Sequence, residues 1–580
     1  MSINKEDKLR GIIEKMTVEE KAGQLMVVDF AGVAPTPHLI KIINQYNCAG
    51  LRIQPNARIK AVYHHGGLDM DICKQRSFRE PIGGCKDLAY EEPAPYCSAS
   101  QYAEILNGLK EMAMNRKSGI PLHTVFDQEG TGFENFTCGT VRLFPSQMGM
   151  AAIENTETVY KSYRAYARQL VAAGLNWIHS PVLDVNTNPK NLEVGVRGFS
   201  DKPELVAKYG EIMLKAFQAE KLIATAKHFP GRGESDVDAH LDLPVIGIAR
   251  EQLMKDHVYP YRKLITEGLP AVMIAHTVYP ALDNSDVPAT VSYDIITGLL
   301  RKELGFKGAI TTDNLLMNGL IKKYEIPDAA VRAIRAGATL LLPRAESSLI
   351  DEIYHALIKA IKDGSLPEQI VDEAIYYNLS VKYEYGLFEN GGIVEPVLAD
   401  QIQKDREVIA LEAAAADESV VVMQDKQNIL PLAVGQRVLL IDQVGQTQKN
   451  MNNLHCHPGI FWELLLKQSP DVICVETVGK KKLDEETEYR VKRRIEEADI
   501  IIGVAYNPHK GSKLNMEVLK KVKDLGKKMI LVTNSPYGVP LEFETVVVTF
   551  SDATESLRAA AEIIYGKRIA KGKLPVSNHC

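Results

Sequence analysis

Short apolar runs alternate with amphipathic stretches over the first 390 residues, and this alternation restricts the fold more than any other feature of the sequence. The runs are five to ten residues long, as expected for strands that are buried on both faces of a parallel sheet. The predicted strands begin at Gly23, Ala49, Pro121, Asn176, Leu222, Ala271, Gly308 and Ala338. Helical periodicity fills most of the gaps, for example over residues 158–174, where Gly174 marks the end of the helix.

Eight strand–helix units predict a TIM-type (β/α)8 barrel over residues 1–390. A doubly wound open sheet would show the same alternation, but the polar residues favour the barrel. Side chains able to do chemistry follow strand ends at Asp127, Asp184, Lys227, His228, His276 and Asp313. All strand ends of a barrel open onto one face, whereas those of an open sheet would not all converge. We therefore expect an active site at the carboxyl ends of the strands.

The alternation restarts near residue 405, after a segment with two glycines and a proline. A helix and further apolar runs predict a smaller C-terminal α/β domain over residues 405–580, an open-sheet sandwich with helices on both sides. Residues 391–404 are interpreted as the linker. The second domain shows no obvious glycine-rich phosphate loop, so its sequence does not predict a nucleotide site.

Residues 54–97 interrupt the barrel pattern with an irregular inserted loop. Long loops in compact domains usually serve a function or are disordered, and this one follows a strand's carboxyl end, on the expected active-site face. It contains His64, His65 and three of the eight cysteines, from which a metal site could be built. The cysteine spacing matches no zinc pattern, so we expect free thiols, no metal and no cofactor.

The composition limits which partners and which cellular location we expect for this chain. The formal net charge of −6 provides no long-range attraction to nucleic acid or anionic lipid, so neither is expected as a partner. No segment approaches the ~20 apolar residues of a membrane span, and the charged N-terminus lacks the apolar core of a secretory signal. We expect a cytoplasmic protein, and a homodimer stays open as its assembly.

The densest group of reactive side chains lies in residues 227–245, KHFPGRGESDVDAHLDLPV, which begin at a strand end. A purely structural loop has little reason to collect so many titratable groups. Asp238 and His240 are two residues apart, so the carboxylate can bend back onto the imidazole. This contact would fix the tautomer and favour the imidazolium, leaving the second ring nitrogen to transfer a proton.

Asp313, in TTDNLLM at the end of the seventh predicted strand, has two interpretations. It caps the following helix, or it is a nucleophile that faces the acid/base loop across the barrel mouth. Asp127 and Glu129 in FDQEG, with Arg197 further along, suit a substrate rich in hydroxyl groups, because carboxylates accept and arginine donates hydrogen bonds. Asp184 either binds such a substrate or holds Arg197.

Several motifs together resemble glycoside hydrolase family 3, above all its β-N-acetylglucosaminidase-like branch. The motifs are MTVEEKAGQLM, FDQEG, SPVLDVNTNP, VGVRGFS, KHFPGRG with DAHLDLP, AHTVYP, TTDNLLM and, near the end of the chain, GKLPVS. The resemblance implies that His240 is the acid/base residue, Asp238 its partner and Asp313 the nucleophile. The residues expected to bind the substrate are Asp127, Arg197, Lys227, His228, Asp184, His276 and Arg232.

The resemblance further implies a retaining exo-β-N-acetylglucosaminidase. Such an enzyme acts through a covalent glycosyl–aspartate intermediate, here on a small carbohydrate with an N-acetylglucosamine-like sugar. Two alternatives remain open. One is a phosphorylase, in which phosphate replaces water. The other is a family member repurposed for acyl transfer or sugar binding in a biosynthetic pathway.

The chain departs from the family pattern at the rim of the expected site. Arg232 replaces the usual second histidine of KHFPGHG, and Gly130-Thr131-Gly132 lacks the arginine of the usual GGR. The usual arginine after the second strand has no clear match, and Arg52 and Arg58 are the candidates to substitute for it. We infer that the catalytic groups are kept while the site for the leaving group is changed.

Overall fold

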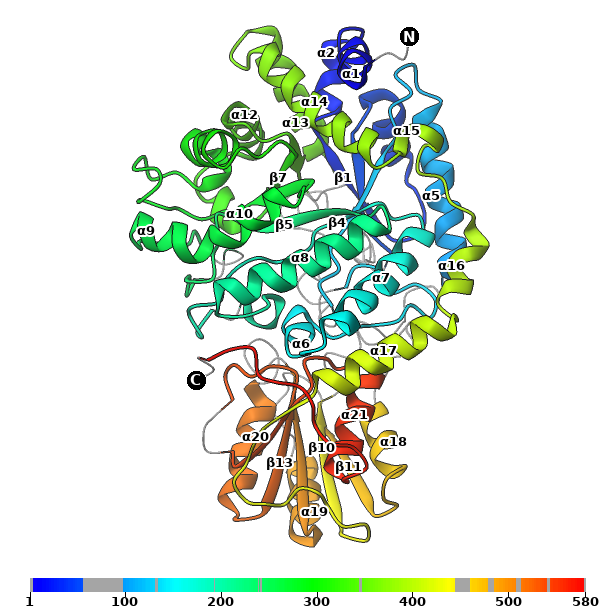
Figure 1. The fold of residues 1–580 in the computed structure, drawn as a ribbon, viewed down its shortest axis with the longest axis vertical. Helices are drawn as coiled ribbons and strands as arrows, with labels where there is room; N and C mark the ends of the chain where they lie inside the picture. The colour runs from blue at the N-terminus through cyan, green and yellow to red at the C-terminus, as the bar shows by residue number, and fades with distance from the viewer. Residues whose placement is uncertain are drawn as a thin grey trace.

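Eight parallel strands form a barrel in the first part of the chain (Figure 1). The computed structural model describes residues 4–55, 97–130, 134–191, 193–237, 239, 242–343, 347–443, 459–477, 485–506, 513–539 and 543–577. The strands are β1 (Val27–Ala31), β2 (Gly50–Gln54), β3 (His123–Phe126), β4 (Trp177–Ile178), β5 (Ile223–Phe229), β6 (Ala271–Ile274), β7 (Ala309–Asn314) and β8 (Leu340–Leu342). They pair in chain order, and a parallel bridge between Met26 and Leu341 brings β8 onto β1. The predicted (β/α)8 barrel is therefore confirmed, and each strand overlaps its predicted run.

Helices connect the strands on the outside of the barrel. The main connections are α3 (Pro37–Lys41) with η1 (Ile42–Tyr46), α5 (Ala99–Met114), α7 (Thr156–Ala172), α8 (Pro203–Ala219), α10 (Tyr259–Thr266), η7 (Asp294–Glu303), α12 (Ile326–Ala336) and α13 (Ser348–Lys362). Shorter pieces are α6 (Gln147–Ala151), η4 (Gly195–Arg197), α9 (Arg250–Gln252), η5 (Leu253–His257), η6 (Ala289–Val291) and α11 (Asn318–Ile321). The barrel is flanked by α1 (Lys5–Ile13) and α2 (Val18–Gly23) before it, and by α14 (Glu368–Glu384), α15 (Leu387–Asn390) and α16 (Pro396–Ile402) after it. Ser98 and Gln101 form a capping box at the start of α5, so local sequence sets where this helix begins.

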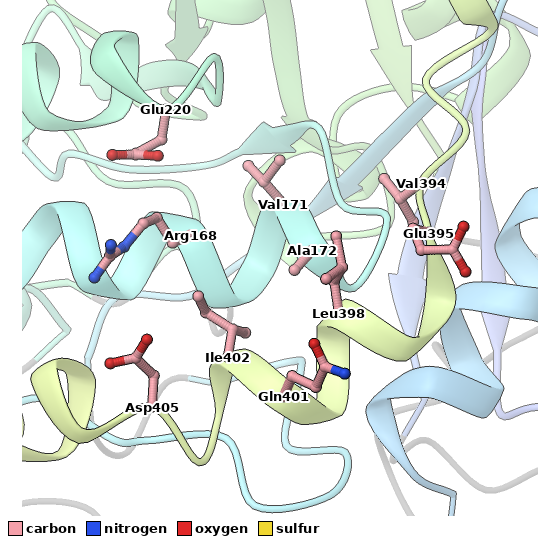
Figure 2. A pocket seen from close by; sticks show the side chains of 10 residues that line it. All are labelled: Arg168, Val171, Ala172, Glu220, Val394, Glu395, Leu398, Gln401, Ile402 and Asp405. Atoms are coloured by element: carbon pink, nitrogen blue, oxygen red, sulfur yellow. The ribbon is translucent and has the colours of Figure 1, made fainter.

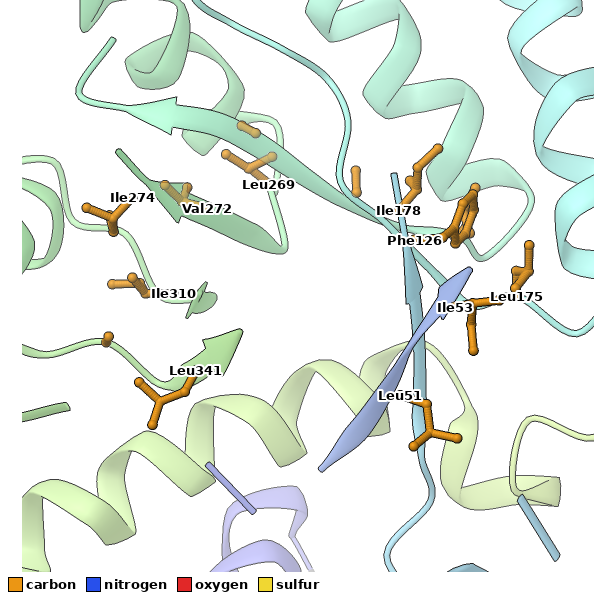
Figure 3. Packing of buried hydrophobic residues seen from close by; sticks show 14 of the residues in the cluster. Leu51, Ile53, Phe126, Leu175, Ile178, Leu269, Val272, Ile274, Ile310 and Leu341 are labelled. Atoms are coloured by element: carbon orange, nitrogen blue, oxygen red, sulfur yellow. The ribbon is translucent and has the colours of Figure 1, made fainter. Parts of the chain in front are cut away.

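Alternate strand residues divide between the inside and the outside of the barrel, because successive side chains of a strand point to opposite faces. The interior cluster contains Val27, Val125, Trp177, Ile223, Met273 and Leu340. The outer cluster, which also includes helix residues, contains Leu51, Phe126, Ile178, Val272, Ile310 and Leu341 (Figure 3). The barrel is therefore filled with side chains, and its chemistry has to take place at one end.

Buried lysines seal the amino-terminal end of the barrel. Lys382 on α14 donates to the carbonyls of Ala49 at 2.8 Å and Pro121 at 2.6 Å, just before β2 and β3. Lys110 on α5 donates to the carbonyl of Gly174 at 2.7 Å, and burial lowers the pKa of its ammonium group to about 7. Because this end is closed by side chains from the outer helices, the opposite end is the one open to a substrate.

A second, six-stranded sheet forms the C-terminal part of the chain (Figure 1). Its order is β11 (Val472–Thr477), β10 (Val438–Gln443), β12 (Ile500–Ala505), β13 (Lys528–Thr533), β14 (Thr545–Val548) and β9 (Val421–Asp425). The pairs are parallel except that β9 runs antiparallel to β14. Its helices are α18 (Ile460–Leu466), α19 (Glu485–Glu497), α20 (Lys513–Asp524) and α21 (Thr554–Ile564). The predicted smaller α/β sandwich is confirmed, but β11 was not predicted. It is an edge strand whose Ile473 is 41% exposed, although its sequence, VICVET, begins with a short apolar run.

The helix α17 (Arg406–Ser419) joins the two parts, because it contacts both α7 of the barrel and α21 of the second sheet (Figure 1). The segment predicted as a linker, residues 391–404, includes α16, which contacts α5. The domain limits at 1–390 and 405–580 stay predictions. Within the described part of the chain, we find no helix long and apolar enough to cross a membrane.

Candidate active site

The structure brings most of the predicted site residues together at the carboxyl-terminal end of the barrel. The described members of this group are Asp127, Asp184, Arg197, Lys227, His228, Arg232 and Asp313. Asp238 and His240, the predicted acid/base pair, lie outside the described residues. The contacts fall into two clusters, one centred on Asp127 and one on Asp184.

Asp127, directly after β3, is the centre of the first cluster. Lys227 Nζ from β5 lies 2.9 Å from its Oδ1, His179 Nδ1 lies 3.3 Å from the same oxygen, and Arg52 from β2 contacts Oδ2. Burial alone would raise the pKa of Asp127, but the charges of Lys227 and Arg52 hold that pKa well below its usual range. The side chain keeps 19% of its surface exposed, so an ionised carboxylate is accessible at the mouth.

Glu129 links the first cluster to η4, in the loop after β4. Arg197 donates two hydrogen bonds to its carboxylate, from Nε at 2.6 Å and from Nη2 at 3.0 Å. Lys227 Nζ lies 2.5 Å from the same carboxylate. Burial would raise the pKa of Glu129, but Arg197 and Lys227 lower it to about 2. Glu129 is therefore the carboxylate that holds the Arg197 side chain, whereas the sequence had suggested Asp184 as one candidate for this role.

Asp184 is fully buried after β4 and is the centre of the second cluster. Its Oδ2 lies 2.7 Å from His228 Nδ1, and its Oδ1 accepts the backbone N–H of Arg232 at 2.8 Å. Arg232 Nη2, which can only donate, lies 3.2 Å from His228 Nε2. Nε2 must therefore accept, so the ring proton is on Nδ1 and points to Asp184. Burial and the charge of Arg232 lower the pKa of His228 to about 4, in agreement with a neutral ring.

Asp313, near the end of β7, lies beside the second cluster. Its Oδ1 accepts the backbone N–H of Asn314 at 2.7 Å, and its Oδ2 lies 3.8 Å from His228 Nε2 and 4.0 Å from Arg232 Nη1. Burial would raise the pKa of Asp313, but its neighbours His228, His276 and the permanently charged Arg232 hold that pKa well below the usual range. The following helix α11 begins without a side-chain cap. The structure thus does not support the capping interpretation of Asp313.

His276, after β6, is fully buried, and both ring nitrogens contact the protein. Nδ1 lies 2.6 Å from the hydroxyl of Thr290, and Nε2 donates to the carbonyl of Asn314 at 2.9 Å. These contacts brace the end of β7 next to Asp313. They favour a supporting role for His276 over the direct contact with a substrate that the sequence suggested.

A surface pocket lies away from these clusters, between α7 and α16 (Figure 2). Its lining includes Val171, Leu398 and Ile402. It contains none of the clustered residues and sits on the outer flank of the barrel, so it is not the candidate active site.

The described residues contain no group of three or more His, Cys, Asp or Glu side chains placed to hold a metal ion. The predicted alternative of a metal site in the inserted loop rests on His64, His65, Cys73, Cys85 and Cys97. All of these except Cys97 lie outside the described residues. Cys48, Cys97 and Cys138 carry free thiols.

Comparison with known proteins identifies the family. The family model described as "Glycosyl hydrolase family 3 N terminal domain" matches residues 17–380. The chain belongs to glycoside hydrolase family 3. This match spans all eight strands of the barrel and every residue of the two clusters.

Individual relatives indicate the branch of family 3 to which the chain belongs. β-Hexosaminidase A from Pseudoalteromonas piscicida is 28% identical over 83% of this chain and 88% of its own. A β-hexosaminidase from Nitrosomonas eutropha is 31% identical over 41% of this chain and 69% of its own. The solved family 3 β-N-acetylglucosaminidase from Paenibacillus sp. str. FPU-7 has a TM-score of 0.80 and 23% identity, covering 97% of this chain and 99% of its own, which shows a shared fold. The chain is a glycosidase of the β-N-acetylglucosaminidase-like branch.

Sequence reasoning left some partners in this family 3 site unassigned. Arg52 was one of two candidates for the arginine near the second strand, and it contacts Asp127 directly. The other candidate, Arg58, lies outside the described residues. Glu129 was noted in FDQEG without a partner. His179 lies inside the predicted strand that begins at Asn176, whereas β4 ends at Ile178, so the sequence did not place His179 at a strand end.

Proposed function

We propose that this family 3 enzyme removes terminal β-linked N-acetylglucosamine from small carbohydrates with retention of configuration. The geometry of Asp313 carries the proposal. Oδ1 is bonded to a backbone N–H, while Oδ2 lies 3.8 Å from Nε2 of the neutral His228 ring and 4.0 Å from the cationic Nη1 of Arg232. An ionised oxygen without a short bond to a cation is what a carboxylate nucleophile needs. The β-hexosaminidase relatives support N-acetylglucosamine as the sugar.

The proposed reaction has two steps. In the first, Asp313 Oδ2 attacks the anomeric carbon while protonated His240 gives its proton to the leaving oxygen, so the glycosidic bond breaks and a glycosyl–aspartate ester forms. In the second, His240 takes a proton from water, whose oxygen attacks the anomeric carbon and releases Asp313 as a carboxylate. Asp238 is proposed to hold the imidazole of His240 in the tautomer that both proton transfers need.

The first cluster is proposed to bind the hydroxyl groups of the sugar. Asp127 is held by Lys227 and Arg52 and offers an acceptor, and Arg197 is held by Glu129 and offers a donor from a side chain that is 10% exposed. Because these charged groups are already paired and ordered, little conformational entropy is lost when a sugar binds.

The second cluster is proposed to support Asp313. Asp184, His228 and Arg232 are at most 2% exposed. Their polar groups face one another at 2.7 to 3.2 Å. This placement favours holding the nucleophile over the contact with the substrate that the sequence suggested.

Release of 4-nitrophenol from its β-N-acetylglucosaminide tests the proposed function. We expect turnover by the wild-type protein and a loss of at least about 10³-fold in kcat for Asp313→Asn, because an amide cannot attack the anomeric carbon. Asp328→Asn is the matched control, since Asp328 is an exposed carboxylate paired with Arg332 on α12. It should leave kcat unchanged. A folded wild-type protein without turnover would contradict the proposal.

Product analysis separates hydrolysis from phosphorolysis. Retaining hydrolysis should release the β-anomer of the free sugar first, detected by proton NMR, at a rate that does not depend on phosphate. Formation of a sugar 1-phosphate in phosphate buffer would instead assign a phosphorylase. Release of the α-anomer first would contradict the covalent intermediate.

A further inference from the structure

Glu193, in the loop after β4, connects two parts of the site. Its Oε1 lies 2.9 Å from Arg232 Nη2, and its Oε2 accepts the backbone N–H of Ala239 at 3.2 Å. Ala239 is fully buried, and its carbonyl accepts the N–H of Gly319 at 3.1 Å. Both backbone polar groups of Ala239, which lies between the two residues of the proposed acid/base pair, are therefore bonded to other elements.

Arg232 gives Glu193 a partner that is itself fixed. It is 1% exposed, its backbone N–H donates to Asp184 at 2.8 Å, and its carbonyl accepts from Asn191 Nδ2 at 2.7 Å. Its Nη2 also lies 3.2 Å from His228 Nε2. The guanidinium keeps its charge at any working pH and so stabilises the carboxylate form of Glu193, which accepts stronger hydrogen bonds than a neutral group does.

We propose that Glu193 and Arg232 form a positioning pair that sets the backbone of Ala239, and with it the acid/base pair, relative to Asp313. The inference rests on the proposed function. In this role neither residue touches the reacting atoms, because both act through the peptide of Ala239. A misplacement of about 1 Å can cost about 10²-fold in rate, so one firmly bonded peptide next to His240 has a measurable effect.

This role accounts for the departure from the family pattern at Arg232, where a histidine is usual. An imidazole has two ring nitrogens and titrates near neutral pH, whereas a guanidinium has five N–H donors and a permanent charge. Here one guanidinium nitrogen reaches both His228 and Glu193. The arginine is therefore assigned to holding the acid/base segment, and not to a changed contact with the sugar.

The dependence of the rate on the leaving group separates a positioning role from a merely structural one. A strongly acidic phenol departs without protonation, whereas a weakly acidic one needs the general acid. Glu193→Gln keeps the size of the side chain and removes its charge. We expect kcat/KM, which covers the steps up to the glycosyl–enzyme, to fall at least about 10-fold for the 4-methoxyphenyl β-N-acetylglucosaminide and less than about 3-fold for the 2,4-dinitrophenyl one.

Thr187→Val is the matched control. The hydroxyl of Thr187 donates to the carboxylate of Glu234, so this bond joins the loops after β4 and β5 but does not involve Ala239. This variant should change kcat/KM equally for both substrates. Glu193→Asp keeps the charge and shortens the side chain, so it should show the selective loss and tests the pair if Glu193→Gln does not fold. Equal losses on both substrates would overturn this inference and leave the proposed function intact. A wild-type enzyme that cleaves neither substrate would overturn the proposed function and this inference with it.

Discussion

His228 shows how its neighbours set the protonation of one residue. Asp184 alone would favour the imidazolium, but Arg232 donates to the other ring nitrogen and burial opposes a charge. The ring is therefore neutral at neutral pH, and Arg232 is the permanent cation beside Asp313 in the second cluster. The ionised state of the proposed nucleophile thus depends on an arginine, whose charge does not change over the working pH range.

The low pKa of His228 predicts a loss of stability in acid. Its pKa of about 4 in the folded protein lies below the roughly 6.5 of an exposed histidine, so the unfolded chain binds one more proton between these values. The free energy of unfolding should therefore fall as the pH drops through this window, by up to about 3 kcal/mol from this residue. Urea unfolding at several pH values between about 7 and 5 measures the slope.

Two variants test whether His228 causes this dependence of the unfolding free energy on pH. His228→Asn keeps a donor toward Asp184 and removes the titrating ring, so the dependence on pH should become weaker. His355→Asn changes an exposed histidine on α13 and should leave the slope as it is. A wild-type stability that does not change with pH would show that His228 is not held neutral against protonation.

At the scale of elements, the loops after β4 and β5 are packed tightly against each other. A Cβ atom at Gly233 would lie 1.7 Å from the carbonyl oxygen of Val185. Nearby, the N–H of Leu183 donates to the carbonyl of Lys227 at 2.7 Å. The second cluster takes Asp184 and Arg232 from these two loops, so its distances depend on this close approach.

Gly233→Ala should therefore disturb both stability and activity. We expect the free energy of unfolding to fall by about 1–3 kcal/mol, because the added methyl group overlaps backbone that cannot move freely. The kcat/KM for an aryl glycoside should fall as well, because the loops that carry Asp184 and Arg232 are pushed apart. Gly247→Ala is the control, since a Cβ there would meet nothing within 4 Å. Similar urea-unfolding curves for the two variants would argue against this tight packing.

At the scale of the whole molecule, the two domains share a hydrophobic cluster. Val196, beside Arg197 in the barrel, belongs to the same cluster as Phe550 and other buried residues of the second sheet. The backbone N–H of Ser146, just before α6, donates to the carbonyl of Phe550 at 3.1 Å. Figure 1 shows α6 at the border with the second sheet. The second domain therefore contributes to the packing of the loop that carries Arg197.

Phe550→Ala should reveal this shared packing. Removing the ring leaves a cavity at the junction, and we expect the free energy of unfolding to fall by about 3–5 kcal/mol in urea. Tyr489→Ala removes an aromatic side chain on α19 that is 64% exposed, and should change stability by less than about 0.5 kcal/mol. If the two variants were equally stable, the ring of Phe550 would not be part of a shared core.

The sequence by itself determined the order of elements and the end of the barrel where the chemistry takes place. Strands buried on both faces require continuous apolar runs, and such runs can be recognised without knowing what they pack against. Polar residues that follow these runs must then meet at the carboxyl end of a barrel. The prediction missed edge strand β11, although VICV at its start is such a run.

Only the tertiary structure decided which charged residues pair. Arg197 is held by Glu129, 68 positions away, and Arg52 by Asp127, 75 positions away. Nothing in local periodicity encodes these choices, because a charge can pair with any opposite charge within reach. What lies within reach is set by the loops that follow the strands. The same loops place Arg232 between His228 and Glu193, a position that its place in KHFPGRG does not reveal.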